Sequence, residues 1–249
     1  MIRGLYTAAS GMLATQTQSD LIAENVANVK TPGYQEKDGS AVAFPTLLME
    51  RVAKEFGDVP TAVPIGEMGT GVYVNQYNIV DRPAELQPGS NSDLALTSPG
   101  FFTLQTPDGL RYTRKGVFKV TDQGELQTQE GYAVMGKNGP IRNLTSDFKV
   151  RPDGAVLVNN QVVDTLQIVN APLINLQQVG DSLYASTGQP LQPAAQVKVQ
   201  QGIIEGSNVD IPGQMTKMIT VMRAYEANQK VIQTQDSTLE KAVNEVGKI

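Results

Sequence analysis

The C-terminal end of the chain carries an apolar repeat that predicts one long helix. Apolar side chains recur there in alternating steps of four and three residues, and Lys, Glu, Gln, Thr and Asn fill most positions between them. The apolar positions are Ile211, Met215, Met218, Met222, Tyr225, Ile232, Leu239, Val243 and Val246. A period near 3.5 residues is typical of a helix that lies along another helix. Pro212 fits a first helical turn, so the helix is predicted to start at 209–212.

Two positions of this repeat, Gln229 and Asp236, are polar. They could set the register, face a polar partner, or mark where the stripe turns toward water. Each buried apolar side chain contributes about 1.5–3 kcal/mol, whereas ordering each residue costs about 1–2 kcal/mol of backbone entropy. The helix is therefore expected to fray without a partner surface, which one arm of an intramolecular hairpin or a neighbouring molecule would supply.

A second and narrower repeat occupies residues 2–26. Its positions are again spaced three and four apart, and they are Ile2, Leu5, Ala9, Met12, Gln16, Ser19, Ala23 and Val26. Small side chains suit close approach to a bulkier helix, so the two terminal helices are predicted to pair. Pro32 and Gly33 predict that the first helix ends by Thr31.

Between the helices the pattern changes to that of strands. Residues 34–86 lose the helical period, and alternation at 72–80 predicts an arm with β-ribbon character, with a short helix at 46–53. Short apolar runs between turn signals then predict an all-β module over 87–186. Its hairpin dipeptides are Asp108-Gly109, Asn138-Gly139 and Asp153-Gly154. Its predicted core residues are Phe101, Phe102, Leu104, Tyr112, Phe118, Val120, Leu126 and Val134.

The sequence thus predicts an α+β fold in which terminal coiled-coil helices flank an inserted all-β module. Its predicted segments are an N-terminal helix over 1–33, a connecting arm over 34–86, the all-β module over 87–186, a return segment over 187–206 and a C-terminal helix over 207–249.

Composition argues against most catalytic chemistry. The 249 residues include no Cys and no His, which removes thiolate ligands, disulfides and the commonest general base. A net charge of −5 without a basic stripe disfavours nucleic acid as a partner, and no apolar run reaches the roughly 18 residues of a membrane span. The glycines from Gly66 to Gly71 match no phosphate or dinucleotide loop. We therefore expect no enzymatic activity and no catalytic, cofactor-binding or metal-binding residues.

Motifs at both ends and in the middle of the chain resemble bacterial flagellar rod and hook proteins. The motif that closes the first helix contains Asn25, Asn28, Thr31, Pro32, Gly33 and Tyr34, and the C-terminal motif contains Ser207, Asn208 and Arg223. The central blocks are Gly100-Phe101-Phe102 and Tyr112-Thr113-Arg114-Lys115-Gly116. Glu24 departs from the family's pattern, in which a second Asn is common at this position.

The resemblance implies a structural subunit of the flagellar basal-body rod, which self-assembles through its terminal helices into a helical axial tube and transmits torque from motor to hook. It implies further copies, other rod and hook proteins and the flagellar type III export apparatus as partners, and a place in the basal body within the cell envelope and periplasm. The resemblance also implies export without cleavage, which agrees with an N-terminal stretch that is a poor signal peptide. The expected interface residues are Ile2, Leu5, Ala9, Met12, Ala23, Val26, Ile211, Met215, Met218, Met222, Tyr225, Ile232, Leu239 and Val243.

Two alternatives remain open at this point. The blocks Gly69-Thr70-Gly71-Val72 and Arg223-Ala224-Tyr225-Glu226 resemble distal rod proteins of the family, whereas the compact return segment also suits a proximal rod component. A monomeric binding or adaptor protein with a closed helical hairpin is the competing class. Replacing Met218 and Met222 with Glu is expected to abolish assembly and motility in a rod subunit.

Overall fold

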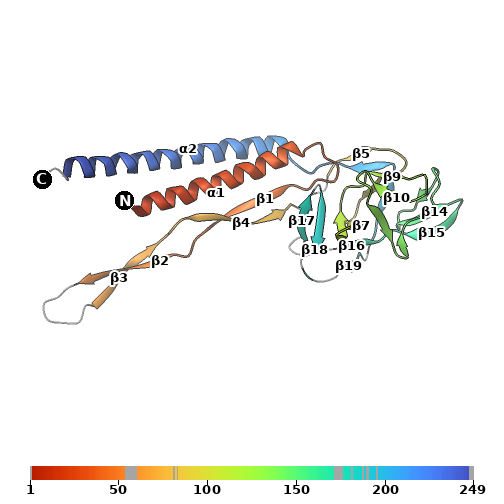
Figure 1. Ribbon diagram of the computed structural model, residues 1–249, viewed down its shortest axis with the longest axis horizontal. Coiled ribbons are helices and arrows are strands. Elements are labelled where there is room, and N and C mark those ends of the chain that lie inside the picture. Colours follow the sequence, from red (N-terminus) through yellow and green to blue (C-terminus); the bar gives the residue numbers. More distant parts are fainter. Residues whose placement is uncertain are drawn as a thin grey trace. The chain divides into compact units, whose positions relative to one another are not determined.

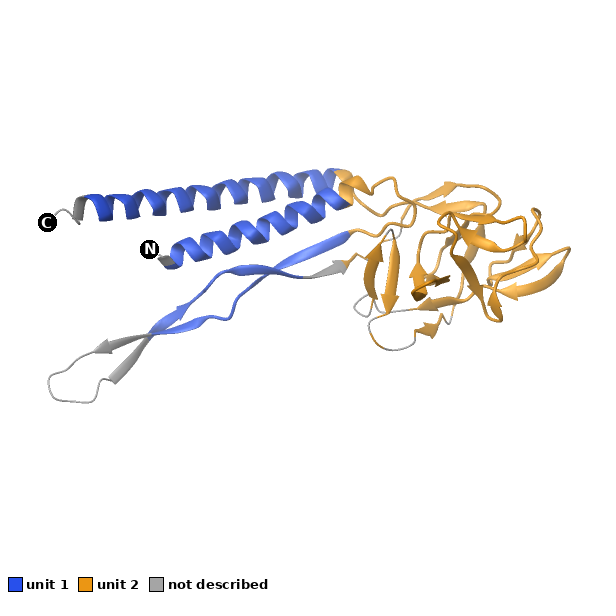
Figure 2. Cartoon of the chain, viewed as in Figure 1, with its two compact units in different colours: residues 1–24, 37–77, 212–249 blue, residues 25–36, 78–211 orange. Residues whose placement is uncertain are grey.

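The computed structural model describes residues 2–53, 61–80, 82, 84–170, 176–180, 182–186, 188, 191–194 and 196–246. The chain divides into two compact units, which Figure 2 distinguishes by colour. Unit 1 contains Met1–Glu24, Lys37–Tyr77 and Pro212–Ile249, and unit 2 contains Asn25–Glu36 and Asn78–Ile211. Each unit is therefore assembled from segments that are far apart in the sequence.

Two long helices and a two-stranded ribbon account for most of unit 1 (Figure 1). The helices are α1 (Ile2–Ala27) and α2 (Ile211–Lys241), and a π-helical turn, η2 (Ala242–Val246), follows α2. In the ribbon, β1 (Lys37–Ala43) pairs with β4 (Val72–Ile79), and β2 (Leu47–Ala53) pairs with β3 (Thr61–Met68). The predicted start of the C-terminal helix and the predicted end of the first helix are both confirmed.

The ribbon corrects one prediction. The composition of residues 46–53 predicts a short helix, but the structure has the strand β2 there, with Leu47 opposite Met68 in the antiparallel pair. Leu, Met, Glu and Arg favour a helix locally, yet pairing with β3 satisfies the backbone groups of the segment as a strand. Tertiary pairing here overrides a weak local preference.

The larger part of unit 2 is one antiparallel sheet. Its strands follow the order β17-β18-β8-β7-β11-β10-β9, with β12 beside β11, β16 beside β7 and β19 beside β16. These strands are β7 (Phe101–Thr106), β8 (Gly109–Thr113), β9 (Phe118–Val120), β10 (Leu126–Thr128), β11 (Ala133–Gly136), β12 (Gly139–Pro140), β16 (Ile168–Asn170), β17 (Leu176–Gly180), β18 (Leu183–Ser186) and β19 (Gln192–Pro193).

The described part of unit 2 also contains three smaller sheets. The strands β13 (Lys149–Val150), β14 (Ala155–Val158) and β15 (Gln161–Thr165) form one of them. In the other two, β20 (Val199–Gln201) pairs with β6 (Leu94–Leu96), and β21 (Ile203–Glu205) pairs with β5 (Leu86–Pro88). The end of the predicted return segment therefore runs antiparallel to the strands that open the module.

The hairpin dipeptides lie at the turns where the sequence predicts them. Asp108-Gly109 joins β7 to β8, Asn138-Gly139 joins β11 to β12, and Asp153-Gly154 joins β13 to β14. The glycine of each pair has a positive φ, of 106°, 125° and 85° in chain order. Tight hairpin turns need this conformation, which side chains with a Cβ rarely adopt.

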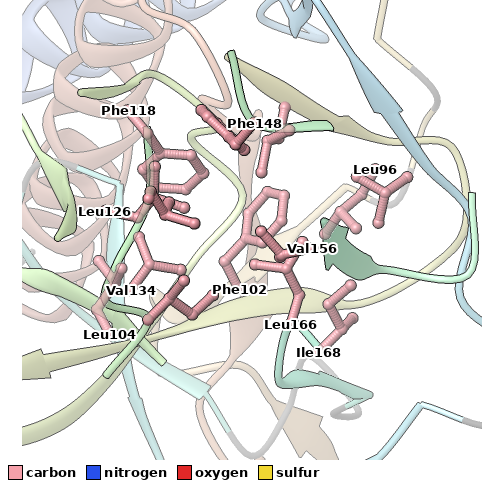
Figure 3. Packing of buried hydrophobic residues seen from close by; sticks show 14 residues of the cluster. Leu96, Phe102, Leu104, Phe118, Leu126, Val134, Phe148, Val156, Leu166 and Ile168 are labelled. Carbon is pink, nitrogen blue, oxygen red and sulfur yellow. The ribbon is translucent and has the colours of Figure 1, made fainter. Parts of the chain in front are cut away.

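The predicted core residues are buried in unit 2, except Val120, which packs against the core while partly buried. Figure 3 shows the main cluster, in which the Phe102 and Phe118 rings meet edge to face with centroids 5.2 Å apart. Phe101 and Tyr112 belong to a second cluster, together with Tyr184. The predicted residues are therefore confirmed as core, but they divide between two clusters.

Candidate functional site

In unit 1, α1 and α2 lie side by side and run antiparallel (Figure 1). Three contacts define their register: Gly4 with Gln235, Gly11 with Asn228, and Ser19 with Met218. From Gly4 to Ser19 on α1 the residue numbers rise, while those of their partners on α2 fall from Gln235 to Met218. The two helices are therefore antiparallel. The predicted pairing of the two terminal helices is therefore present within one chain.

The covered face of α2 keeps the predicted period but is rotated relative to the predicted one. The covered positions are Gln214, Met218, Val221, Tyr225, Asn228, Ile232, Gln235, Leu239 and Ala242, again in steps of four and three. The expected residues Met218, Tyr225, Ile232 and Leu239 are among them. The remaining described members of the predicted repeat are exposed: Ile211, Met215, Met222, Gln229, Asp236 and Val243.

On α1 the covered row also lies one residue before the predicted one. Its positions are Gly4, Ala8, Gly11, Thr15, Gln18, Ile22 and Asn25. Of the expected interface residues, Leu5, Ala9 and Met12 are half-buried, whereas Ala23 and Val26 are exposed. The side chains of Ile2 and Val246 lie outside the described set. A role for all these residues in contacts between molecules remains a prediction.

Two glycines of α1 make room for amide side chains of α2. A Cβ at Gly11 would lie 2.9 Å from Asn228 Nδ2, and one at Gly4 would lie 3.1 Å from Gln235 Nε2. Both glycines and both amides are seven residues apart on their helices, so the same arrangement occurs twice. The inner face of α2 therefore receives polar side chains at positions where a purely apolar seam would hold aliphatic ones.

Gln235 gives the first testable prediction. Its Oε1 is buried and accepts no hydrogen bond from any residue that the structure describes. An unsatisfied buried polar atom costs about 1–3 kcal/mol, so Gln235→Leu is expected to stabilise the helix pair by about 1–2 kcal/mol. Urea unfolding followed by helical circular dichroism measures this change.

The matched control is Gln229→Leu, which makes the same substitution at an exposed position of α2. It is expected to change the free energy of unfolding by no more than about 0.5 kcal/mol. Equal stabilisation by both variants, or destabilisation by Gln235→Leu, would contradict the assignment of Gln235 Oε1 as an unpaired buried atom.

The outward face of α2 is apolar over its first half. Ile211, Met215, Ile219 and Met222, which we call the outer stripe, are 41%, 61%, 54% and 55% exposed and follow one another at three- or four-residue spacing. Single exposed apolar residues are ordinary, but a contiguous row along one helix face marks an interaction surface. Three amide side chains, Gln214, Asn228 and Gln235, thus lie on the covered face of α2, while this apolar row faces solvent.

Unit 2 contains a buried cluster of polar residues, which we call the polar anchor: Gln35, Glu36, Arg114, Glu205 and Asn208. All but Arg114 are at most 6% exposed. Arg114 Nε donates to Glu205 Oε2 at 2.8 Å, and its other nitrogens donate to the carbonyls of Gly100 and Leu96. The buried carboxylate is thereby paired with a guanidinium, which offsets the cost of removing both from water.

Asn208 connects the segments that meet at the anchor. Its Oδ1 accepts from the Glu36 N–H at 2.6 Å, and its Nδ2 donates to Gln35 Oε1 at 2.9 Å. The same Nδ2 donates to the carbonyls of Val80 and Arg82 at 2.8 and 3.2 Å. One side chain therefore holds three stretches of chain together, and each stretch adjoins a point where the chain passes to or from unit 1.

Gly33 lets the first of these stretches approach the backbone just after β8. A Cβ at this position would lie 2.4 Å from the backbone N of Lys115, and its φ is +67°. The Gly33 N–H donates to the Glu205 carbonyl at 2.8 Å. Only glycine fits both the backbone conformation and the contact, which gives a physical reason for the Pro-Gly pair at the end of the motif.

The other motif residues support the same turn. The Tyr34 hydroxyl donates to Asn25 Oδ1 at 3.1 Å, and the Thr31 hydroxyl donates to Asn28 Oδ1 at 3.1 Å. Pro32 lies between them, just after α1 ends. The remaining two motif residues, Ser207 and Arg223, lie elsewhere in the chain.

Ser207 Oγ accepts a weak bond from the Val209 N–H at 3.4 Å, beside the anchor. Arg223 is exposed on α2.

Sequence reasoning missed Gln35, Glu36 and Glu205, because their partners are up to 173 residues away along the chain and no local pattern marks them.

Two further observations concern the part of the chain that the structure describes. It holds no group of three or more His, Cys, Asp or Glu side chains placed to bind a metal ion. None of its helices is long and apolar enough to cross a membrane.

Three family descriptions match separate stretches of the chain. "Flagella basal body rod protein" matches residues 5–35, "Flagellar hook protein FlgE/F/G D1 domain" matches 95–158, and "Flagellar basal body rod FlgEFG protein C-terminal" matches 200–245. The first and last of these stretches include most of α1 and α2, and the second lies within unit 2.

Full-length relatives agree with these matches. The chain is 31% identical to the flagellar hook-basal body complex protein FlhO of Bacillus subtilis, over all of both chains. It is 31% identical to the flagellar basal-body rod protein FlgG of the same species, over 98% of this chain and 99% of the relative. It is also 30% identical to the flagellar basal-body rod protein FlgF of Caulobacter vibrioides, over all of both chains.

Proposed function

Because the chain belongs to the flagellar basal-body rod protein family, whose members are structural and not enzymatic, we propose that it self-assembles through α1 and α2 into a helical axial tube of the rod. Within this tube the subunits transmit torque from the motor to the hook. Further copies of the chain and other rod and hook proteins are its partners.

The observation that carries this proposal is the distribution of side chains on α2. Its inward positions include the amides Gln214, Asn228 and Gln235, whereas Met215 and Met222 face outward and are more than half exposed. A helix pair that served only to close one chain would place these residues the other way round. The outward face therefore fits a second, intermolecular interface.

A rod needs contacts that repeat without closing. When one face of a subunit meets a different face of the next, an open helical array results. Packed helices along such an array resist twisting, because close-packed side chains do not rearrange smoothly under strain. These properties suit a shaft that carries torque.

We place the chain at the distal part of the rod, with a proximal position as the alternative. The blocks at 69–72 and 223–226 support the distal position through their resemblance to distal rod proteins. Export by the flagellar type III apparatus, without cleavage of a signal peptide, would deliver the chain to this location. Ends that order only on docking would help passage through a narrow channel.

A monomeric adaptor with a closed helical hairpin is the competing function. The antiparallel pairing of α1 and α2 is compatible with it, but an apolar face left in water is not explained by it. The two functions differ in what happens to the terminal helices when the chain joins a basal body.

Hydrogen–deuterium exchange tests the proposal. In dilute solution we expect fast exchange in α1 and α2 and slow exchange in the core strands of unit 2, because the helix pair has few buried apolar side chains. In basal bodies purified from the source bacterium, the helices are expected to exchange at least tenfold more slowly. Absence of the chain from basal bodies, or strong protection of both helices in the dilute chain, would favour the adaptor.

A further inference from the structure

A second apolar surface of unit 1 lies near the start of α1 and the last third of α2. It is a groove of about 600 Å³, whose lining includes Arg3, Tyr6, Leu47, Met68 and Val231. Tyr6, Leu47 and Val231 are 68%, 56% and 45% exposed. The groove thus combines side chains of both helices and the ribbon into one concave apolar site.

The outer stripe of the same chain does not reach this groove. The groove residues on α2 are Asn228 and Val231, and Met222, the nearest stripe residue, lies about 9 and 14 Å from them along α2 at about 1.5 Å per residue. Both surfaces belong to one straight helix, which keeps them apart. An outer stripe that fills the groove must therefore come from another molecule.

The charges at the two surfaces are complementary. Among the residues that the structure describes, Arg3 is the only charged one that lines the groove. Glu226 follows Met222 by one helical turn and is exposed. Neither side chain forms an ion pair with any residue in the described part of the chain. An outer stripe seated in the groove would bring a carboxylate to the rim that carries the guanidinium.

We propose that the groove of one copy binds the outer stripe of the next copy, with Met222 in the apolar groove and Glu226 paired with Arg3. This inference rests on the proposed function and specifies which two surfaces meet. Because the surfaces differ, the contact is heterologous and propagates without closing. Seating Met222 at the level of Asn228 or Val231 displaces successive copies along the helix axis by roughly 9–14 Å, at about 1.5 Å per residue.

Cysteine cross-linking tests the contact, since the natural chain has no Cys. The double variant Tyr6→Cys/Met222→Cys places one thiol in the groove and one in the stripe. Within a chain these positions lie about 16 Å apart, given that Gly4 faces Gln235 and Gly11 faces Asn228. A disulfide needs Cα atoms within about 7 Å, so only bonds between molecules form. Oxidised basal bodies are expected to contain a ladder of covalent multimers of this chain.

Matched variants define the outcome. Each single variant is expected to give no ladder, and Leu13→Cys/Met222→Cys, whose α1 thiol lies about 10 Å from the groove position, is expected to give at least tenfold less multimer. Efficient dimers of Met222→Cys alone would show that the stripe pairs with itself. Cross-links to a different basal-body protein would show a different occupant. Either result overturns the proposal.

Charge reversal gives a second readout. Arg3→Glu is expected to lower the yield of the ladder at least tenfold, and Arg3→Glu/Glu226→Arg is expected to restore it. Failure of the double reversal to restore the ladder would exclude the ion pair.

If the chain is present in basal bodies and the ladder is absent, the pairing of groove and stripe is wrong while rod membership stands. If the chain is absent from basal bodies, the proposed function itself fails.

Discussion

Gly33→Ala is expected to destabilise unit 2 by about 4 kcal/mol, a large share of the 5–15 kcal/mol that stabilises a typical domain. The added Cβ would lie 2.4 Å from Lys115 N and 2.7 Å from Arg114 C, and both atoms are backbone. The left-handed φ of +67° adds about 1–2 kcal/mol of strain. Relief of the clash would also break the bond from the Gly33 N–H to the Glu205 carbonyl. Urea unfolding monitored by near-ultraviolet circular dichroism measures the loss.

Gly131→Ala is the matched control within unit 2. Gly131 has a φ of +91°, but no heavy atom lies within 4 Å of the position that its Cβ would take. The substitution therefore adds conformational strain without a clash, and a cost of about 1–2 kcal/mol is expected. Equal losses in the two variants would mean that the approach of Gly33 to the backbone just after β8 does not contribute to stability.

Met215→Glu/Met222→Glu is expected to abolish incorporation into basal bodies and motility while leaving the isolated chain folded. Both side chains are more than half exposed, so the free energy of unfolding should change by less than about 0.5 kcal/mol per site. Met and Glu also have similar helix propensities. In an assembled rod, each carboxylate would be buried without a partner, which costs several kcal/mol per contact. Swimming in soft agar and immunoblots of purified basal bodies report the two effects.

The control adds the same charges elsewhere on α2. Gln229→Glu/Gln233→Glu changes two exposed positions outside the outer stripe and the groove, and near-normal motility is expected. Met218 is a poorer test position, because it contacts Ser19 inside the helix pair and its substitution would also disturb the chain itself. Motility in the Met215→Glu/Met222→Glu variant would contradict assembly through the outer stripe.

Features with a local signal could be predicted from the sequence. The Asp-Gly and Asn-Gly turns placed three hairpins correctly, because few residue pairs tolerate the required backbone angles. The alternating apolar runs identified core residues such as Phe102 and Val134, which are fully buried. Pro212 located the start of α2, and the Pro32-Gly33 pair set the latest possible end of α1, which ends at Ala27, since proline fits only the first turn of a helix.

The orientation of the helices could not be predicted from apolar periodicity alone. The predicted row of α2 overlaps the covered row at Met218, Tyr225, Ile232 and Leu239, but its other apolar members, such as Met215 and Met222, face solvent. The inner row contains Asn228 and Gln235, which pack on glycines of α1. The prediction assumed that the most apolar row faces the partner helix, as it does in a closed monomer. It therefore placed the covered row of α1, and alternate positions of the covered row of α2, one residue too late.

The burial of the polar anchor could not be predicted from the sequence, for a different reason. Its residues are polar, and polar residues are mostly exposed, so nothing in their composition indicates burial. Glu205 meets Arg114 across 91 residues and Gln35 across 170. Such contacts depend on the path of the whole chain, whereas the motif that ends at Tyr34 marks only the turn beside them.

The two residues of unit 2 that flank the ribbon segment are joined by a backbone hydrogen bond. The Val80 N–H donates to the Glu36 carbonyl at 2.8 Å, and both residues are held by the anchor through Asn208. Residues 37–79 therefore form an excursion whose ends are fixed independently of what lies between them. Lengthening a loop with fixed ends costs only about 0.6 kcal/mol for each doubling. Insertions and deletions in this segment should leave unit 2 intact, so evolution can vary the reach of the ribbon without redesigning the rest of the protein.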